Sequence, residues 1–196
     1  MTLTNSVPTT TGATTPVPDD TTWSRPIRVE VITGSVREGR FGPVVADWFT
    51  RHAAARGDLA VRTLDLAASP PELADRIGAA DAVVVVTPEY NHSYPASLKA
   101  AIDWHFIHWT AKPVGFVSYG GAAGGRHAVL HLENVLTELH AVTIRDGLSF
   151  PNYFIAWQDG RPLDSDADTY AKAMFDQLAW WAAALRTARA TVPYPA

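Results

Sequence analysis

The sequence predicts an α/β domain in which a doubly wound parallel sheet is covered by helices on both faces. From residue 27 onward, short apolar runs alternate with segments of helical periodicity, which is the pattern of right-handed strand–helix–strand units. The run at residues 82–86 is unbroken and mostly valine, as expected of a central parallel strand that is buried on both faces. A glycine-containing loop leads from the first strand directly into a helix.

The first half of the domain supplies three strands and two helices. Residues 27–33 form an apolar first strand, and residues 42–56 follow as a helix with a valine, a tryptophan and a phenylalanine on one face. Residues 60–65 alternate between apolar and polar, as in a half-exposed edge strand. A short helix at residues 71–79 then precedes the central strand at residues 82–87.

The second half continues the alternation. Residues 95–108 are expected to be helical, residues 114–118 form a fourth strand, and residues 126–139 form a helix. A short fifth strand follows at residues 142–145. The last helix covers residues 164–189, and its acidic first turn suits the positive end of the helix dipole.

Composition indicates one globular domain. The chain has 196 residues, of which 47% are hydrophobic and 18% charged. A net charge of −4 argues against nucleic acid as the main partner, and the lack of cysteine excludes disulfides, thiol catalysis and thiolate metal sites. With no apolar stretch of membrane-spanning length and no signal-peptide pattern, we expect a cytoplasmic protein without a membrane partner.

Residues 1–26 differ from the rest of the chain. They are rich in threonine, proline, serine and aspartate and contain almost no core-forming side chains. We expect a disordered N-terminal extension there, with residues 27–196 as the domain.

The loop after the first strand predicts a phosphate site. Ser35 offers a hydroxyl, Arg37 and Arg40 offer charge-assisted donors, and the following helix offers unpaired N–H groups at its positive end. The loop lacks the lysine of a P-loop and the glycine spacing of a dinucleotide fingerprint. The alternative is a tight turn with two solvated arginines.

Two further loops follow strands of the same sheet. Residues 87–95 read Thr-Pro-Glu-Tyr-Asn-His-Ser-Tyr-Pro, and residues 118–126 read Ser-Tyr-Gly-Gly-Ala-Ala-Gly-Gly-Arg. Ligands of doubly wound sheets bind beyond the carboxyl ends of the strands. Here a proline and a tyrosine favour a flat slot, and paired glycines let the main chain approach a planar ligand.

Together these motifs closely resemble those of the NADPH-dependent FMN reductase family, which includes quinone and azo-dye reductases. The resemblance covers roughly residues 27–145. It implies a flavodoxin-like fold with a five-stranded parallel sheet in the order 2-1-3-4-5, FMN as cofactor, NADPH or NADH as electron donor, and a homodimer with flavin sites near the subunit interface. The long N-terminal extension and the aromatic segment at residues 104–109 depart from the family pattern.

The resemblance also implies residue roles. Three residues would hold the phosphate, four would line the isoalloxazine and ribityl region, and three would approach the other edge of the ring. In that order they are Ser35, Arg37 and Arg40; Pro88, Glu89, Tyr90 and Asn91; and Ser118, Gly120 and Gly121. Because the flavin performs the hydride chemistry, no catalytic side chain is expected.

Other features are open to simpler interpretations. The histidine pairs 127/131 and 105/108 form no complete zinc motif, so no metal is expected. Glu89 is either a general base or, more simply, a hydrogen-bonding strut. The aromatic segment at residues 104–109 is either core or a partner surface.

The leading hypothesis is an FMN-dependent NAD(P)H oxidoreductase that passes electrons to a small acceptor such as free flavin, a quinone, an azo compound or a metal ion. A second enzyme hypothesis treats FMN as a substrate that is reduced and delivered to a flavin-dependent monooxygenase. A non-enzymatic flavodoxin-type carrier or a flavin-binding redox sensor is the alternative from another class, although a net charge of −4 is mild for a docking carrier.

Overall fold

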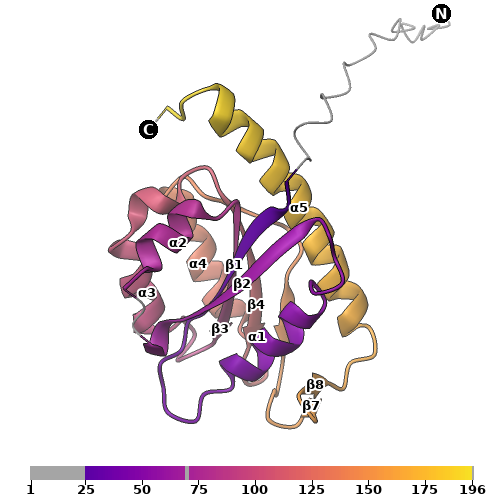
Figure 1. Ribbon diagram of the computed structural model, residues 1–196. Helices are drawn as coiled ribbons and strands as arrows, with labels where there is room; N and C mark the ends of the chain where they lie inside the picture. Colours follow the sequence, from indigo (N-terminus) through magenta and orange to yellow (C-terminus); the bar gives the residue numbers. More distant parts are fainter. Residues whose placement is uncertain (1–24, 69–70, 196) are drawn as a thin grey trace, which may run out of the picture.

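The computed structural model describes residues 25–68 and 71–195, and it shows a parallel sheet between two layers of helices (Figure 1). The main sheet has the order β2-β1-β3-β4-β5, with every pair parallel. This confirms the predicted fold class and the strand order implied by the resemblance. The expected extension at residues 1–26 lies outside the described residues except for its last two.

The bounds of the elements follow the chain. The strands are β1 (Ile27–Thr33), β2 (Leu59–Asp65), β3 (Ala82–Pro88), β4 (Pro113–Tyr119), β5 (Val142–Thr143), β6 (Leu148–Phe150), β7 (Trp157–Gln158) and β8 (Arg161–Pro162). The helices are α1 (Gly42–Arg51), α2 (Leu73–Ala79), α3 (Ala96–Asp103), α4 (Arg126–Glu138) and α5 (Ala167–Thr191), with short 3₁₀ turns η2 (Leu66–Ala68) and η3 (Phe106–Trp109).

The fifth strand is split, which the sequence did not predict. Both β5 and β6 pair with β4, at its beginning and at its end respectively. Gly147 lies between them and passes so close to β4 that an added β-carbon would be 3.1 Å from the Phe116 carbonyl oxygen. The remaining segment forms the β7–β8 hairpin and was also unpredicted.

Two expected helices are shorter than predicted. α1 ends at Arg51, because the next residues form tighter bonds to the carbonyl three residues back. α3 ends at Asp103, and the chain then turns through η3 to bury Trp109 completely. The aromatic segment is therefore divided between interior and surface, since Trp109 belongs to the core whereas Phe106 and Ile107 are 58% and 63% exposed.

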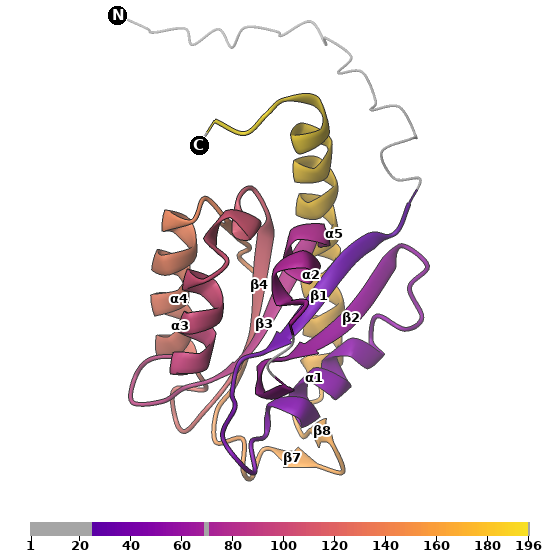
Figure 2. The same cartoon turned by 60° about the vertical axis from the view of Figure 1, so that its left-hand side comes forward.

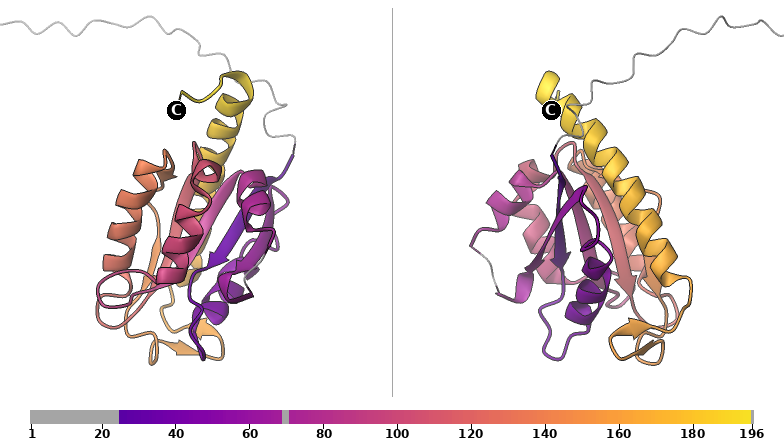
Figure 3. Two further views of the ribbon diagram at one scale, coloured as in Figure 1. Left: turned by 90° about the vertical axis from the view of Figure 1, so that its left-hand side faces the viewer. Right: turned by 45° about the vertical axis from the view of Figure 1, so that its right-hand side comes forward.

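Two cores hold the layers together. α1 and α5 cover one face of the sheet, where the rings of Phe49 and Phe175 stack with centroids 4.4 Å apart. α2, α3 and α4 cover the other face through Ile77, Leu98 and Leu132, as the two views of Figure 3 show. Because both faces are covered, the ends of the strands are what remains for binding.

The loops after β1, β3 and β4 leave the sheet at one edge, the lower edge in Figures 1 and 2, and the β7–β8 hairpin lies beside them. The described C-terminal residues lie at the opposite edge. Among the described helices, none combines the length and the apolar character needed to cross a bilayer.

A buried carboxylate organises the opposite edge. The side chain of Asp81 is 2% exposed and accepts hydrogen bonds from the Arg28 main-chain N–H at 3.0 Å and from the Arg25 guanidinium at 2.9 and 3.0 Å. Burial alone would raise the pKa of Asp81, but these hydrogen bonds outweigh it and hold the pKa below its usual range. Asp81 thus joins the starts of β1 and β3.

Replacing Asp81 with asparagine should lower the free energy of unfolding at pH 7 by about 2 kcal/mol, since hydrogen bonds to a charged group contribute about that much. A folded-state pKa below the unfolded value of about 3.9 stabilises the protein above that pH, and the stabilisation is lost as the pH falls through the folded pKa. In urea unfolding, the free energy of unfolding of Asp81→Asn should therefore be lower than that of wild type at pH 7, and this difference should shrink on acidification to pH 3.

Asp47→Asn is the matched control, because Asp47 is 70% exposed and within the described chain its carboxylate forms an ion pair only with Arg51 on the same helix. Its effect should stay within about 0.5 kcal/mol. If Asp81→Asn lowered the free energy of unfolding by the same amount at pH 7 and at pH 3, the stabilising role of the Asp81 carboxylate would be contradicted.

Candidate functional site

The loop after β1 is fastened to the loop after β3. Ser35 is completely buried, and its Oγ lies 2.7 Å from Tyr90 Oη in a hydrogen bond. The Arg37 main-chain N–H donates to the same Ser35 oxygen at 3.4 Å. The Arg37 guanidinium lies over the Tyr90 ring, 4.1 Å from its centroid, in a cation–π contact. The structure thus brings Ser35, Arg37 and Tyr90 together.

Arg40 has a different environment from Arg37. One of its terminal nitrogens pairs with Asp65 at the end of β2. Its Nε is buried, and no described residue accepts a hydrogen bond from it. A buried N–H without an acceptor is costly, so this arginine is arranged to donate to a group other than the described side chains.

The start of α1 also lacks a negatively charged partner. Phe41 is the N-cap residue and supplies no side-chain hydrogen bond, and the first turn of the helix has no acidic residue. The first N–H groups of a helix carry partial positive charge. In α1 Pro43 has no N–H and the Val44 N–H donates to the Phe41 carbonyl oxygen at 3.0 Å, so the helix contributes the positive end of its dipole, and Arg37 and Arg40 contribute the donors suited to a phosphate dianion.

The loop after β3 makes a two-residue turn. Tyr90 and Ser93 exchange main-chain hydrogen bonds of 2.8 and 3.0 Å. Asn91 and His92 between them both have left-handed backbones, with φ of 51° and 62°, as in a type I′ turn. Pro88 ends β3 opposite Tyr119. The turn therefore presents Asn91 at an exposed position beside Tyr90.

Glu89 is a hydrogen-bonding strut in this structure. Its main-chain N–H donates to the Tyr119 carbonyl oxygen at 2.9 Å. Its carboxylate accepts from the His127 main-chain N–H at 3.2 Å and lies 2.9 Å from His127 Nδ1. Glu89 thus connects the loop after β3 to the start of α4, a contact that the sequence did not reveal because the two residues are 38 positions apart.

Ser118 supports the loop after β4 through hydrogen bonds from the protein interior. Ser118 is 1% exposed, and its Oγ donates to the carbonyl oxygens of Gly124 at 2.9 Å and Leu148 at 3.3 Å. Glycine is required at Gly125, where φ is +90° and a β-carbon would lie 2.5 Å from Ser118 Cβ. Ser118 therefore supports the loop, whereas Gly120 and Gly121 supply its main chain.

The segment after β6 closes against this loop. The main-chain N–H groups of Asn152 and Tyr153 donate to the carbonyl oxygens of Gly121 at 2.9 Å and Gly120 at 3.3 Å. The Tyr153 ring contacts the rings of Phe41 and Tyr119, with centroids 5.0 and 5.2 Å away. This aromatic support was also missed by the sequence analysis, since no local pattern marks it.

Burial strongly raises the pKa of the Tyr119 hydroxyl, so that the phenol stays neutral at physiological pH. Tyr119 thereby acts as an apolar support beneath the loops and supplies no negative charge near the expected phosphate position.

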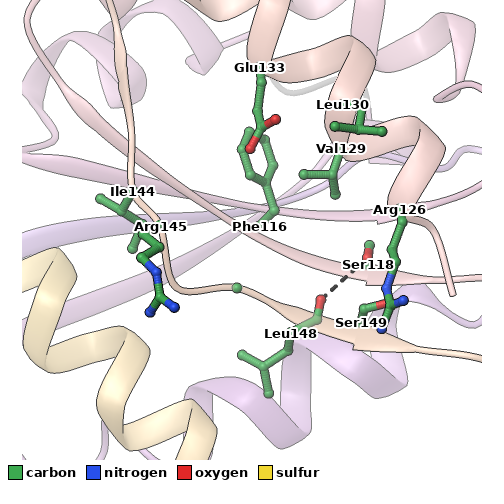
Figure 4. Close-up of a pocket in the computed structure, with 11 residues that line it drawn as sticks. Phe116, Ser118, Arg126, Val129, Leu130, Glu133, Ile144, Arg145, Leu148 and Ser149 are labelled. Carbon is green, nitrogen blue, oxygen red and sulfur yellow. Dashed lines mark hydrogen bonds between the residues drawn. The ribbon is translucent and has the colours of Figure 1, made fainter.

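A cavity of about 310 Å³ lies between α4 and the β4–β6 edge of the sheet (Figure 4). Phe116, Ile144 and Leu148 give it an apolar lining, and Arg126 lies at the start of α4 beside it. Of the ten predicted site residues, only Ser118 lines this cavity. The cavity therefore adjoins the three-loop site at Ser118 and is otherwise lined by different residues.

The residues of the three loops fit FMN. The phosphate would meet Arg37, the partnerless Nε of Arg40 and the positive end of the α1 dipole. The flat ring system would lie between the turn at Tyr90 and the main chain at Gly120, where an added β-carbon would be 3.1 Å from the Gly125 nitrogen. FMN supplies the hydride-transfer chemistry when bound, and these residues bind and orient it.

Comparison with known proteins shows what this chain is similar to. The model of the family described as NADPH-dependent FMN reductase matches residues 27–154. An NAD(P)H-dependent FMN reductase of Schizosaccharomyces pombe is 33% identical over 120 residues, which are 50% of this chain and 60% of that protein. A quinone reductase of Escherichia coli K12 is 33% identical over 141 residues, which are 62% of this chain and 75% of that protein.

A solved structure extends the similarity to the whole fold. The flavoenzyme NAD(P)H:(acceptor) oxidoreductase FerB of Paracoccus denitrificans superimposes with a TM-score of 0.60 at 27% sequence identity, covering 80% of this chain and 97% of that one. The described chain spans less than two thirds of the S. pombe relative's length and nearly all of FerB.

Replacing Arg37 and Arg40 together with alanine should raise the dissociation constant for FMN by about a hundredfold or more, because each charge-assisted hydrogen bond contributes about 1.5–3 kcal/mol. Riboflavin lacks the phosphate, so its affinity should change only a few-fold. Fluorescence titration of both ligands measures the difference, with Arg145→Ala, a 90% exposed arginine, as the control for loss of charge. Equal weakening of FMN and riboflavin would contradict the phosphate assignment.

Proposed function

The chain belongs to the NADPH-dependent FMN reductase family, whose members are oxidoreductases that use FMN and NAD(P)H, and we propose that it passes a hydride from NAD(P)H through bound FMN to a quinone. The observation that supports this most is the meeting of three loops at one edge of the sheet. They combine a phosphate donor set with a flat, glycine-lined slot.

Each loop has a separable task in this proposal. Arg37 and Arg40 hold the phosphate, and Ser35 fixes Tyr90 so that the loop after β3 keeps its place. Pro88 stiffens the end of β3 and removes one main-chain donor. The Gly120–Gly121 main chain, held by Ser118, borders the ring from the other side. These residues position the cofactor and exclude water, which is the protein's contribution to cofactor chemistry.

A quinone is the acceptor that we favour. The similar E. coli protein is named a quinone reductase, and a quinone is a small planar molecule that can occupy the same flat slot as a nicotinamide ring. The described chain has one such three-loop site, so the donor must leave before the acceptor enters. We further propose that the enzyme works in the cytoplasm, where NAD(P)H is available.

Initial-rate kinetics should therefore give parallel double-reciprocal lines when NADPH is varied at several concentrations of benzoquinone. Intersecting lines would mean that both substrates bind at once and would contradict the single-slot proposal. Turnover that depends on added free FMN would instead favour a flavin reductase that serves a monooxygenase. Loaded protein that oxidises no NADPH would favour an electron carrier.

We also propose that the chain forms a homodimer through the surface at α3 and η3. Trp104 is 81% exposed, Phe106 58% and Ile107 63%, and such a concentration of exposed apolar side chains on one surface is typical of a partner site. Trp109, which the sequence placed with this group, is fully buried and belongs to the core instead. A second copy of the chain is the partner implied by the family resemblance.

Replacing Phe106 and Ile107 with aspartate should convert a dimer into a monomer, because two charges would have to be desolvated at the contact. Light scattering measures the particle mass, and turnover should fall with it if the partner borders the slot. Trp180→Asp is the control, since Trp180 is 59% exposed on α5, on the other face of the sheet. A wild-type protein of monomer mass and full activity at micromolar concentration would contradict the dimer.

A further inference from the structure

Glu89, His92 and His127 form a cluster of titratable side chains beside the proposed slot. His127 Nδ1 lies 2.9 Å from Glu89 Oε1. The rings of His92 and His127 stack with centroids 4.3 Å apart and planes within 5° of parallel. The Glu89 side chain is 11% exposed and that of His127 is 43% exposed. The carboxylate is therefore nearly buried, whereas the imidazole beside it reaches solvent.

The backbone of His92 has an unfavourable conformation. Its φ of 62° is left-handed, where a residue with a β-carbon is strained and glycine or asparagine is usual in such a turn. Its neighbour Asn91 has the same conformation and is one of these usual residues. The strained position places the His92 imidazole on His127, which fixes the plane of the His127 ring.

The hydrogen bond to Glu89 determines which nitrogen of His127 is available. A carboxylate only accepts hydrogen bonds, so Nδ1 of His127 carries a proton and donates it to Glu89. Nε2 is therefore the ring nitrogen that is left to face the surroundings. The charged and titratable groups around His127 are Glu89 and His92 in the loop after β3, and Arg126 and His131 on α4.

A metal ion is a poorer occupant of this cluster. An imidazole nitrogen binds an ion in the plane of its own ring, and two stacked parallel rings do not share a plane. The Nδ1 atom of His127 is also already bonded to Glu89. The geometry favours proton transfer over metal binding.

We propose that His127 donates the proton that completes the reduction of the quinone, with Glu89 as the positioning residue. The inference rests on the proposed function. A quinone becomes a hydroquinone by gaining one hydride, which originates from NAD(P)H, and one proton. The His127 Nε2–H bond breaks, an O–H bond forms on the acceptor oxygen, and solvent returns a proton to Nε2. Glu89 stabilises the imidazolium before the transfer and holds the ring afterwards.

Two acceptors separate proton delivery from electron transfer. Benzoquinone needs a proton, whereas ferricyanide takes single electrons and no proton. When FMN-loaded enzyme is reduced with NADPH and mixed with each acceptor, His127→Gln should slow the reaction with benzoquinone by about tenfold or more and that with ferricyanide less than twofold. Glu89→Gln should show the same selectivity for benzoquinone to a smaller extent. The control is His140→Gln, at an exposed histidine that contacts Tyr194, and it should leave both reactions unchanged.

Two further measurements do not depend on turnover. In ¹⁵N NMR spectra of wild-type protein, the neutral His127 ring should be protonated at Nδ1, and in Glu89→Gln a share of the rings should be protonated at Nε2. His92→Gly removes the strain in the turn and should therefore fold, yet it should also lower the benzoquinone rate selectively because the stack is lost.

Each outcome decides a different point. Equal slowing of both acceptors by His127→Gln, or slowing of neither, would overturn the inference while leaving the proposed function intact. A wild-type enzyme that reduces ferricyanide but no quinone would overturn the proposed acceptor and the inference with it. One equivalent of Zn²⁺ bound by wild type but not by Glu89→Gln, His92→Gly and His127→Gln would assign the cluster to a metal instead.

Discussion

The hydrogen bond between Ser35 Oγ and Tyr90 Oη is the contact on which the rest of the site depends. It is 2.7 Å long and lies where Ser35 is completely buried. It is possible because β1 and β3 are neighbours in the sheet and run in the same direction, so that their loops leave at one edge. The loops after β1 and β3 are thereby held in one fixed position relative to each other.

Glu89 connects the loop after β3 to the loop after β4 in a similar way. The Glu89 main-chain N–H bonds to the Tyr119 carbonyl oxygen, and its carboxylate bonds to His127 at the start of α4. One residue thus joins β3, β4 and α4 at the edge where the cofactor is proposed to bind. The same carboxylate is the positioning residue in the proposed proton transfer, because it holds Nδ1 of His127 at 2.9 Å.

Much of the fold followed from periodicity, because the core strands are continuous apolar runs. The strand predicted at residues 27–33 has the observed bounds, and the site loops follow the predicted strands. The split of the fifth strand was not predictable, since it depends on how Gly147 passes β4. Within the site, the bonds from Ser35 to Tyr90 and from Glu89 to His127 were hidden, because they join residues 55 and 38 positions apart.

In the proposed reaction, one FMN bound at the three loops would accept a hydride from NAD(P)H and then give it to a quinone. Anaerobic stopped-flow absorbance at the flavin band tests it directly, by mixing loaded protein first with NADPH alone and then, once reduced, with benzoquinone alone. The flavin absorbance should bleach completely in the first step and recover completely in the second, each at least as fast as steady-state turnover. A flavin that NADPH leaves oxidised, or that benzoquinone leaves reduced, would contradict it.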